Sequence, residues 1–255
     1  MSKTYVITGG STGIGAAVKA KLLEAGHSVI LIDLHNGDIE ADLSKPDGRS
    51  DAIEKVKEIA ENGIDGLVTC AGVGPHFEPV AAIAALNYYG TTELIKGLQP
   101  LLEKKRGAVV AVSSNSAILP GLDTELVSCM SENNEEATLE FCSAAEGAKV
   151  YAASKFAVIK WIRQNAAAAI RKGIRINVVA PGITETPLTN QAFSDERYGA
   201  AMQQFLQMTP IGKMASPDMI AKPILFLLSD DAEYMVGSLM LVDGGVDAQL
   251  RPTQF

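Results

Sequence analysis

Short runs of β-branched and apolar residues alternate along the chain with longer stretches whose apolar positions recur every three to four residues. The short runs have the length and composition of strands, and the longer stretches have the period of helices. Strands that alternate with helices form βαβ units, which place the strands in one parallel sheet with helices on both faces. The pattern predicts strands at Thr4–Thr8, Ser28–Ile32, Ile39–Ala41, Asp65–Cys70, Ala108–Ser113, Ile174–Ala180 and Leu239–Val242.

The stretches between these strands have an apolar face, as Ile14, Val18 and Leu22 show in the first of them. Strands without polar positions are typical of the buried centre of a parallel sheet. No linker, repeat or low-complexity tract interrupts the alternation. The sequence therefore predicts one α/β domain over residues 1–255, a doubly wound Rossmann-type sheet of about seven parallel strands. Its helices are predicted at Gly13–Ala25, Pro46–Glu61, Val80–Gln99, Ala148–Lys172 and Pro217–Leu228.

Two segments depart from the alternation. Residues 120–147 are polar and acidic, and we interpret them as an insertion before the helix at Ala148–Lys172; the alternative is a disordered loop. Residues 186–215 follow a strand's carboxyl end, where open α/β sheets bind ligands. This second segment is predicted to be a substrate-binding lid, and its apolar residues are alternatively the core-facing side of a helix. Its candidate substrate contacts are Leu188, Phe193, Met202, Phe205, Leu206 and Met208.

The amino-acid composition disfavours several classes of binding partner. The formal net charge is −8, which disfavours binding to nucleic acid or to anionic membrane surfaces. No apolar run reaches the roughly 18 residues of a membrane span, and the start of the chain resembles a strand rather than a leader, so we expect a cytoplasmic protein. The three cysteines include no Cys-x-x-Cys pair and the three histidines are scattered, so no metal site is expected.

A glycine-rich turn joins the first strand to the first helix and reads TGGSTGIG from Thr8 to Gly15. Gly9 can turn the chain, Gly13 lets the backbone approach a pyrophosphate, and Gly15 lets the helix pack on the strand. The helix N-terminus presents free N–H groups to phosphates. Asp33, eighteen residues after Gly15, can accept both hydroxyls of an adenosine ribose. The turn predicts a dinucleotide site, and Asp33 favours NAD(H) over NADP(H); a turn without ligand and a simple strand-end aspartate are the alternatives.

Tyr151 and Lys155 are four residues apart on a predicted helix and therefore share one face. By itself such a pair is most often exposed and without function. A nearby ammonium also lowers the pKa of a phenol, which would let Tyr151 act as an acid and base in moving a proton.

Several motifs occur in a fixed order: TGxxxGIG at 8–15, NxxG at 87–90, two serines at 113–114, YxxxK at 151–155 and PG at 181–182. Together they resemble the short-chain dehydrogenase/reductase family over essentially the whole chain. The ending DGGVDAQLRPTQF and the insertion further resemble bacterial family members that act on 3α-hydroxysteroids and other carbonyl compounds.

The resemblance implies roles for individual residues. Tyr151 would be the general acid and base, Lys155 would lower its pKa and hold the nicotinamide ribose, Ser114 would bind the substrate oxygen, and Asn87 would hold a water in a proton relay. Asp42 would bind adenine. The cofactor-binding set would comprise Gly9, Ser11, Thr12, Gly13, Ile14, Gly15, Asp33, Leu34, Asp42, Leu43, Cys70, Ala71, Gly72, Tyr151, Lys155, Pro181, Gly182, Ile183, Thr184 and Thr186.

The chain departs from the family pattern in three places. Cys70 stands where the family has an asparagine, and cysteine is a weak hydrogen-bonding group. Only seventeen residues separate Cys70 from Asn87, which predicts a shortened helix between them, whereas Ser114 and Tyr151 are unusually far apart, at 37 residues.

The resemblance implies an NAD-dependent 3α-hydroxysteroid dehydrogenase that also reduces small apolar carbonyl compounds. The alternatives are a ketoacyl-thioester reductase or another alcohol dehydrogenase of the same family, and, from a different class of protein, a non-catalytic NAD sensor. Because the insertion would obstruct the four-helix contact common in the family, we expect a homodimer that uses another face, near the last helix and strand.

Overall fold

The computed structural model describes residues 2–132 and 134–253. Residue 133 of the insertion and residues 254–255 of the C-terminal motif therefore lie outside the described residues. Seven parallel strands form one sheet in the order β3-β2-β1-β4-β5-β6-β7, as predicted for a Rossmann-type fold. The strands are β1 (Thr4–Thr8), β2 (Ser28–Asp33), β3 (Ile39–Glu40), β4 (Gly66–Thr69), β5 (Ala108–Val112), β6 (Arg175–Pro181) and β7 (Leu239–Val242).

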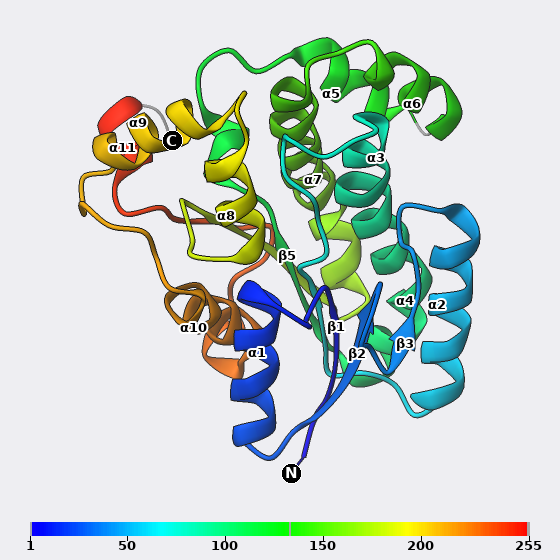
Figure 1. Ribbon diagram of the computed structural model, residues 1–255. Coiled ribbons are helices and arrows are strands. Elements are labelled where there is room, and N and C mark those ends of the chain that lie inside the picture. Colours follow the sequence, from blue (N-terminus) through cyan, green and yellow to red (C-terminus); the bar gives the residue numbers. More distant parts are fainter. Residues whose placement is uncertain (1, 133, 254–255) are drawn as a thin grey trace.

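Helices cover both faces of the sheet, because the central strands are apolar on both sides (Figure 1). One face packs against α1 and α10 around Ile7, Val18 and Ile224, and the other against α2, α4 and α7. The helices are α1 (Gly13–Glu24), α2 (Pro46–Ile59), α3 (Ala81–Ala84), α4 (Thr91–Lys105), α5 (Thr124–Ser131), α6 (Glu135–Ser143), α7 (Gly147–Arg171), α8 (Pro187–Ser194), α9 (Gly199–Met208), α10 (Pro217–Leu228) and α11 (Val246–Leu250), with shorter turns at η1 (Ala85–Gly90), η2 (Asn115–Ile118) and η3 (Asp230–Ala232).

The helix predicted at Val80–Gln99 differs from the structure at its end. It comprises α3, the π-helical turn η1 and α4, and it continues through Pro100 to Lys105. Leu101 and Leu102 extend the buried stripe of α4, so their packing outweighs the backbone hydrogen bond that Pro100 removes. Only the four residues of α3 and the first two of η1 precede Asn87 in this helix.

The insertion is helical. α5 and α6 lie at the end of the molecule where α3 and α7 begin (Figure 1), and α5 buries Leu126, Val127 and Met130 against the core that contains α7. Asp123 and Asn134 cap the two helices through their side-chain oxygens. The described part of the insertion is therefore folded, which contradicts the alternative of a disordered loop.

Candidate functional site

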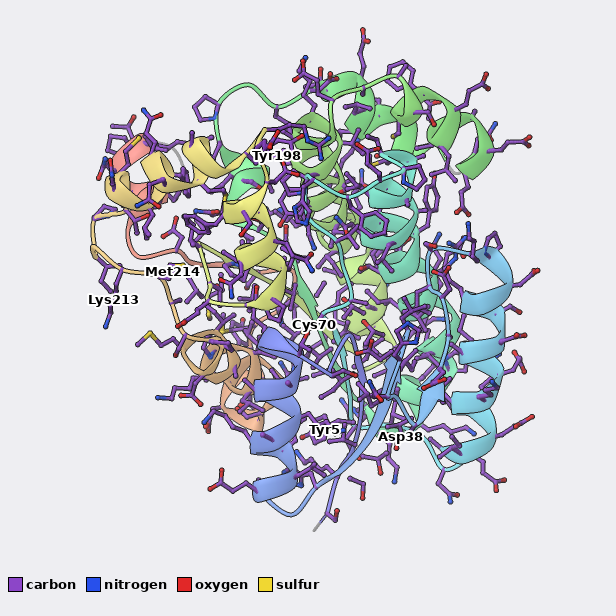
Figure 2. All side chains as sticks on the ribbon, in the orientation of Figure 1. Tyr5, Asp38, Cys70, Tyr198, Lys213 and Met214 are labelled. Atoms are coloured by element: carbon purple, nitrogen blue, oxygen red, sulfur yellow. The ribbon has the colours of Figure 1, made fainter. Side chains whose placement is uncertain are left out.

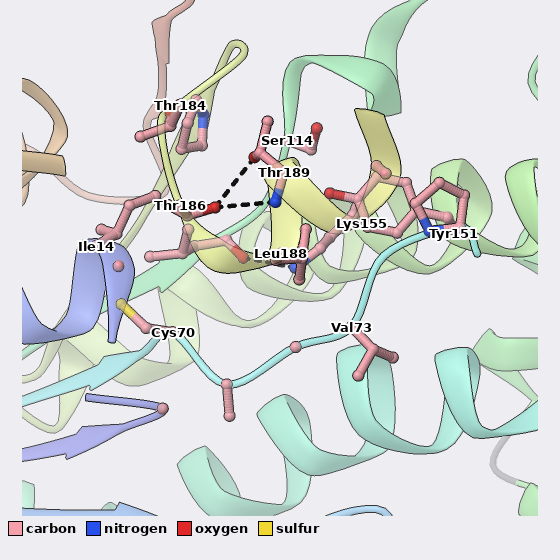
Figure 3. Close-up of a pocket in the computed structure, with 18 of the residues that line it drawn as sticks. Ile14, Cys70, Val73, Ser114, Tyr151, Lys155, Thr184, Thr186, Leu188 and Thr189 are labelled. Atoms are coloured by element: carbon pink, nitrogen blue, oxygen red, sulfur yellow. Dashed lines mark hydrogen bonds between the residues drawn. The ribbon is translucent and has the colours of Figure 1, made fainter. Parts of the chain in front are cut away.

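A cavity of about 600 Å³ opens at the carboxyl ends of the strands, between α1, α7 and α8. Figure 3 shows Ser114, Tyr151 and Lys155 together near α8, with Ile14 of α1 on the other side of the pocket. Cys70 lies near the middle of the molecule (Figure 2), where β4 ends. The cavity lies where ligands bind in open α/β sheets.

The glycine-rich turn fits a dinucleotide through its backbone. Gly9 has φ +68°, and a Cβ there would lie 2.6 Å from the backbone nitrogen of Ala71. A Cβ on Gly15 would lie 2.3 Å from the carbonyl oxygen of Gly9. These contacts bring β1, β4 and α1 close together. Thr12, the N-cap of α1, makes no side-chain capping hydrogen bond, and Thr12, Gly13, Ile14 and Gly15 all line the cavity. The first N–H groups of α1, which have no carbonyl partner within the helix, therefore face the space for a pyrophosphate.

Asp33 ends β2 at the same edge and lines the cavity with Leu34. Its two carboxylate oxygens accept backbone N–H groups of Ser11 at 2.9 Å and Leu34 at 2.8 Å, which fixes the side chain in place. Ser11 does not line the cavity, so its contribution is to orient Asp33. Among the cavity-lining residues that the structure describes, Lys155 is the one lysine or arginine.

The carboxylate of Asp42 accepts hydrogen bonds from the backbone N–H and the hydroxyl of Ser44, at 3.0 and 2.6 Å. Asp42 and Leu43 line the same end of the cavity as Asp33. On the other side of the sheet centre, Cys70, Ala71 and Gly72 follow β4 and form part of the wall. The predicted adenine contacts therefore share one cavity with the predicted ribose contact.

Ser114, Tyr151 and Lys155 meet although 37 residues separate the first two. Ser114 directly follows Ser113 at the end of β5, and α7 passes this point with Tyr151 and Lys155 one turn apart. The hydroxyl of Ser113 donates to the backbone oxygen of Lys155 at 2.8 Å, which joins the strand to the helix. The Lys155 ammonium donates to the carbonyl oxygen of Val112 at 3.2 Å and lies 5.9 Å from the centre of the Tyr151 ring. The long insertion folds as α5 and α6 against the helices at one end of the molecule, so it does not separate these side chains.

Burial shifts the pKa of each titrating group here. It raises the pKa of Tyr151 above its ordinary value, and a hydrogen bond with Ser114 partly opposes that rise. Burial lowers the pKa of Lys155 to about 8, with the opposing influence of Cys70. It also raises the pKa of Cys70 to about 12, so its thiol stays neutral near pH 7. The sequence predicted that Lys155 would lower the pKa of Tyr151. In the structure burial sets the net direction, which is upward, and the opposing influence comes from Ser114.

Asn87 is fully buried in η1 and does not line the cavity. Its amide oxygen accepts the N–H of Val73 at 2.9 Å, and its amide nitrogen donates to the Val73 carbonyl at 3.1 Å and the Ser154 hydroxyl at 3.3 Å. It therefore ties the loop after β4 to α7 behind the cavity wall. A Cβ on Gly72 would lie near both the Asn87 amide oxygen and the Lys155 ammonium, so Asn87 and Lys155 adjoin across Gly72. A role in holding a water stays a prediction.

The predicted nicotinamide contacts follow β6 and line the cavity: they are Pro181, Gly182, Ile183, Thr184 and Thr186. The Thr184 hydroxyl donates to the Gly182 carbonyl at 3.0 Å, and Thr186 caps α8 through hydrogen bonds with the backbone N–H and hydroxyl of Thr189 (Figure 3). These bonds hold the segment in a defined shape beside Gly13, whose Cβ position lies 3.1 Å from the Thr186 methyl group.

The structure places the six predicted substrate contacts of the lid segment in two groups. Leu188, Met202 and Phe205 line the cavity, but Phe193, Leu206 and Met208 do not. Helical geometry accounts for two of them: Phe193 comes five residues after Leu188 and Met208 six residues after Met202, which turns each away from the cavity-facing side. Leu206, one turn after Met202, has no such explanation. Met208 is 42 % exposed.

Hydrogen bonds join the lid segment to the loop after β4. Arg197 donates to the Glu78 carboxylate at 3.0 Å and to the backbone oxygen of His76 at 3.0 Å, and the His76 ring lies 3.3 Å from the Gln191 amide oxygen. Residues that the motifs did not indicate complete the cavity wall. They include Val73, Pro75, Asn115, Ser116, Leu119, Ala148, Thr189 and Tyr198.

The sequence contained an indication for some of these additional cavity-lining residues. Ala148 lies three residues before Tyr151 on the same helix, and Asn115 and Ser116 directly follow Ser114. Tyr198, labelled in Figure 2, comes from the lid segment, and its hydroxyl would lie 3.3 Å from a Cβ at Gly147. Pro75 and Leu119 lie in loops with no periodic pattern, so only the folded chain reveals them.

Two further findings concern metals and membranes. Within residues 2–132 and 134–253, no group of three or more His, Cys, Asp or Glu side chains could hold a metal ion. None of the helices described there is long and apolar enough to cross a membrane.

Comparisons with known proteins agree with the arrangement. Residues 3–124 match the family described as short chain dehydrogenase, and residues 124–247 match the one described as enoyl-(acyl carrier protein) reductase. The chain is 40% identical to a 3-alpha-hydroxysteroid dehydrogenase/carbonyl reductase of Comamonas testosteroni, over 98% of each chain. It is 27% identical to a 3-oxoacyl-(acyl-carrier-protein) reductase of Thermotoga maritima, over 96% of this chain and 97% of the other.

Among solved structures, a 3-alpha-hydroxysteroid dehydrogenase from Pseudomonas sp. B-0831, complexed with NADH, superposes with a TM-score of 0.96. The two sequences are 40% identical, and the alignment covers 99% of this chain and all of the other.

Proposed function

The chain belongs to the short-chain dehydrogenase/reductase family, and on that premise we propose that it is an NAD(H)-dependent oxidoreductase that interconverts 3α-hydroxysteroids and 3-ketosteroids and also reduces other apolar carbonyl compounds. The observation that carries the proposal is the meeting of Ser114, Tyr151 and Lys155 on the wall of a cavity that also contains the glycine-rich turn. The family relation at 40% identity, over nearly the full length, supports the steroid substrate.

The residues present fit NAD(H). Close backbone packing at Gly9 and Gly15 leaves the first turn of α1 open to a pyrophosphate, and the fixed carboxylate of Asp33 is an acceptor for ribose hydroxyls. Asp42 and Leu43 would hold the adenine, and the segment from Pro181 to Thr186 the nicotinamide. When bound, NAD(H) supplies the acceptor or donor of the hydride.

The chain's own residues move the proton. In reduction, the Tyr151 hydroxyl donates its proton to the substrate oxygen as negative charge develops there, and a hydrogen bond from Ser114 stabilises that charge. In oxidation, the Tyr151 phenolate takes the proton from the substrate hydroxyl. The Lys155 ammonium is held beside Tyr151 by the Val112 carbonyl, and its charge favours the phenolate. Lys155 is buried and Tyr151 is half-buried, and the reduced access of water strengthens the attraction between them.

The apolar side chains of the lid segment support the proposal of an apolar substrate. Residues 186–215 contribute Leu188, Met202 and Phe205 to one side of the cavity, opposite the wall formed by α7. Methionine and aromatic side chains adapt well to a rigid apolar ring system. The contacts of Arg197 with Glu78 and His76 hold this lid closed, and their opening is a candidate gate for product release.

The proposal is tested by a panel of 3α-hydroxysteroids, 3β-hydroxysteroids, small aromatic ketones and a ketoacyl thioester, followed at the NADH absorbance. We expect turnover of 3α-hydroxysteroids and aromatic ketones, with kcat/KM at least about tenfold higher for NAD(H) than for NADP(H), because Asp33 repels a 2′-phosphate and no basic side chain beside it offsets the charge. Equal kcat/KM for the two cofactors would contradict the assignment of Asp33.

The same panel separates the alternatives. Activity confined to the thioester would favour a ketoacyl reductase, which would use basic side chains for an acidic carrier, whereas this chain has a net charge of −8. Binding of NADH without turnover of any substrate would favour a non-catalytic sensor.

We also propose a homodimer formed through α10 and β7. α5 packs over α7 and so covers part of the face that the four-helix contact of the family would need. β7 is an edge strand whose side chains are half-buried, and α10 exposes Met219 at 44 % and Phe226 at 40 %. Exposed apolar side chains beside an open sheet edge are typical of an interface. Light scattering should give the mass of a dimer; a stable tetramer would contradict the proposal. A cytoplasmic location likewise stays a prediction, supported by three cysteines with free thiols.

A further inference from the structure

The hydroxyl oxygen of Ser114 accepts two hydrogen bonds from the same neighbour. The backbone N–H of Ser116 donates to it at 3.2 Å, and the Ser116 hydroxyl lies 3.0 Å away in donor geometry. A serine hydroxyl has one proton and two lone pairs. With both lone pairs engaged by Ser116, Ser114 can take part in another hydrogen bond only as a donor.

The local backbone explains how Ser116 reaches this position. Ser114 is extended, with φ −160° and ψ 152°, and it caps η2, the short 3₁₀ turn that follows. The turn brings the chain back on itself, so Ser116 lies beside the side chain that precedes it by two residues. Both residues line the cavity and both are half-buried. Ser116 therefore lies in the reaction site although it belongs to none of the ordered sequence motifs.

Tyr151 is the third partner of Ser114. Their side-chain hydrogen bond lowers the pKa of Tyr151, which is the effect of a donor that stabilises phenolate. Titratable groups near Tyr151 include Lys155 on its own helix, Cys70 at the end of β4, which affects the pKa of Lys155, and Tyr198 of the lid segment, which lines the same cavity.

We propose that Ser116 is a positioning residue, whose hydroxyl keeps the Ser114 hydroxyl turned as a donor, toward the Tyr151 oxygen before substrate binds and toward the substrate oxygen during the reaction; this rests on the proposed function. Donation from Ser116 also polarises the Ser114 O–H bond and strengthens the next hydrogen bond in the series. Without the Ser116 hydroxyl, one lone pair of Ser114 becomes available. Ser114 can then rotate and accept the Tyr151 proton, which is no longer directed at the substrate oxygen.

The test compares Ser116→Ala with Ser116→Thr. In Ser116→Ala we expect kcat to fall about tenfold while KM for substrate stays within about twofold, because a hydrogen bond that acts in the transition state is lost and the pocket keeps its shape. The alkaline limb of the pH profile should move to higher pH, since the phenolate of Tyr151 loses support. Ser116→Thr keeps a hydroxyl at this position and should recover most of the activity.

Two further measurements separate positioning from packing. In a Ser114→Ala background, Ser116→Ala should cause no additional loss, because Ser116 acts through Ser114. Ser143→Ala is the matched control: its exposed hydroxyl donates to the Leu139 carbonyl at 2.8 Å in α6, and its loss should leave kcat unchanged. A full further loss in the Ser114→Ala background would overturn the proposal, as would equal impairment of Ser116→Ala and Ser116→Thr or a Ser116→Ala enzyme with wild-type kcat and pH profile.

The ionisation of Tyr151 provides a readout that does not depend on turnover. The near-ultraviolet absorbance of phenolate, taken as the difference between each protein and its Tyr151→Phe counterpart, reports the pH at which Tyr151 ionises. We expect a higher pH in Ser116→Ala than in the wild type. If the wild type turns over none of the panel, the proposed function fails, and this titration alone decides the proposal: an unshifted Tyr151 would overturn it.

Discussion

Replacing Tyr151 with phenylalanine should reduce turnover of a 3α-hydroxysteroid about a thousandfold, since general acid–base catalysis by one side chain contributes roughly 10²–10⁴-fold. Phenylalanine keeps the ring on α7 but removes the hydroxyl that is hydrogen-bonded to Ser114. Binding of NADH, followed by its fluorescence, should change little, because the cradle of α1 and the carboxylate of Asp33 remain. The expected result is thus a loss in kcat with intact cofactor binding.

The pH dependence supplies a second measurement on Tyr151. Burial places the pKa of Tyr151 above its ordinary value, so the phenolate needed for oxidation increases as the pH rises toward the alkaline range. Wild-type oxidation should therefore accelerate with pH, whereas the residual rate of Tyr151→Phe should not follow that ionisation. Tyr234→Phe is the control, since Tyr234 is 99 % exposed. A Tyr151→Phe enzyme within a few-fold of wild type would contradict the mechanism.

Replacing Arg49 with alanine should lower the free energy of unfolding by about 3 kcal/mol, the lower end of the range for breaking a buried ion pair. Arg49 is 1 % exposed, and its guanidinium contacts the carboxylates of Glu93 in α4 and Glu135 in α6, each at 2.5 Å. It also donates to the carbonyl oxygen of Leu43 at 3.3 Å and lies 6.0 Å from the centre of the Tyr89 ring. One side chain thus joins α2, α4, the insertion and the adenine end of the cavity.

The size of this effect follows from what the substitution leaves behind. Glu135 is 20 % exposed, and its second carboxylate oxygen is buried without a hydrogen-bond partner among the described residues, so the loss of Arg49 leaves a poorly solvated charge. Glu93 is more exposed, at 39 %, and its loss of a partner costs less. This difference is the reason for an expected value near the lower end of the range.

Urea unfolding measures this change as a shift of the midpoint at constant slope. Arg49→Met fills a similar length without charge and should recover little of the lost stability, because both carboxylates stay unpaired. Arg163→Ala on the exposed side of α7 is the control and should change stability by less than about 0.5 kcal/mol. An Arg49→Ala protein as stable as this control would show that the ion pairs contribute nothing to holding the insertion.

Much of the fold was predictable because local pattern and tertiary packing agree. The apolar strands and the periodic helices predicted the seven-stranded sheet, and α10 and β7 begin and end at the predicted residues. The structure differs from the sequence pattern, or goes beyond it, where tertiary packing outweighs the secondary-structure preference of the local residues. α4 continues through Pro100 because Leu101 and Leu102 bury themselves against the core, and the polar residues of the insertion form α5 and α6 because capping by Asp123 and Asn134 is combined with burial of Leu126 and Met130.

Part of the candidate site was likewise predictable from the sequence, and part was not. Backbone-dependent features were readable in the sequence, since a glycine-rich turn between a strand and a helix is typical of a dinucleotide site, and the spacing of Tyr151 and Lys155 fixes their common face. The sequence did not indicate which apolar residues of the lid segment line the cavity. Phe193 and Met208 are as apolar as Leu188 and Met202, and only the rotation of α8 and α9 against the sheet distinguishes them.

The sequence by itself determined the parallel sheet, the glycine-rich turn before the first helix, the carboxylate at Asp33 and the common helix face of Tyr151 and Lys155, because each depends on residue type at short spacing. Only the tertiary structure decided that Ser114 meets Tyr151, that Ser116 fills both lone pairs of Ser114, and that burial outweighs the Ser114 hydrogen bond in setting the pKa of Tyr151. The physical reason is that contact across long separations, the direction of a hydroxyl proton and the desolvation of a charge all depend on which groups surround a side chain. Those groups come from β5, η2 and α7 together, and no local stretch of the chain contains them all.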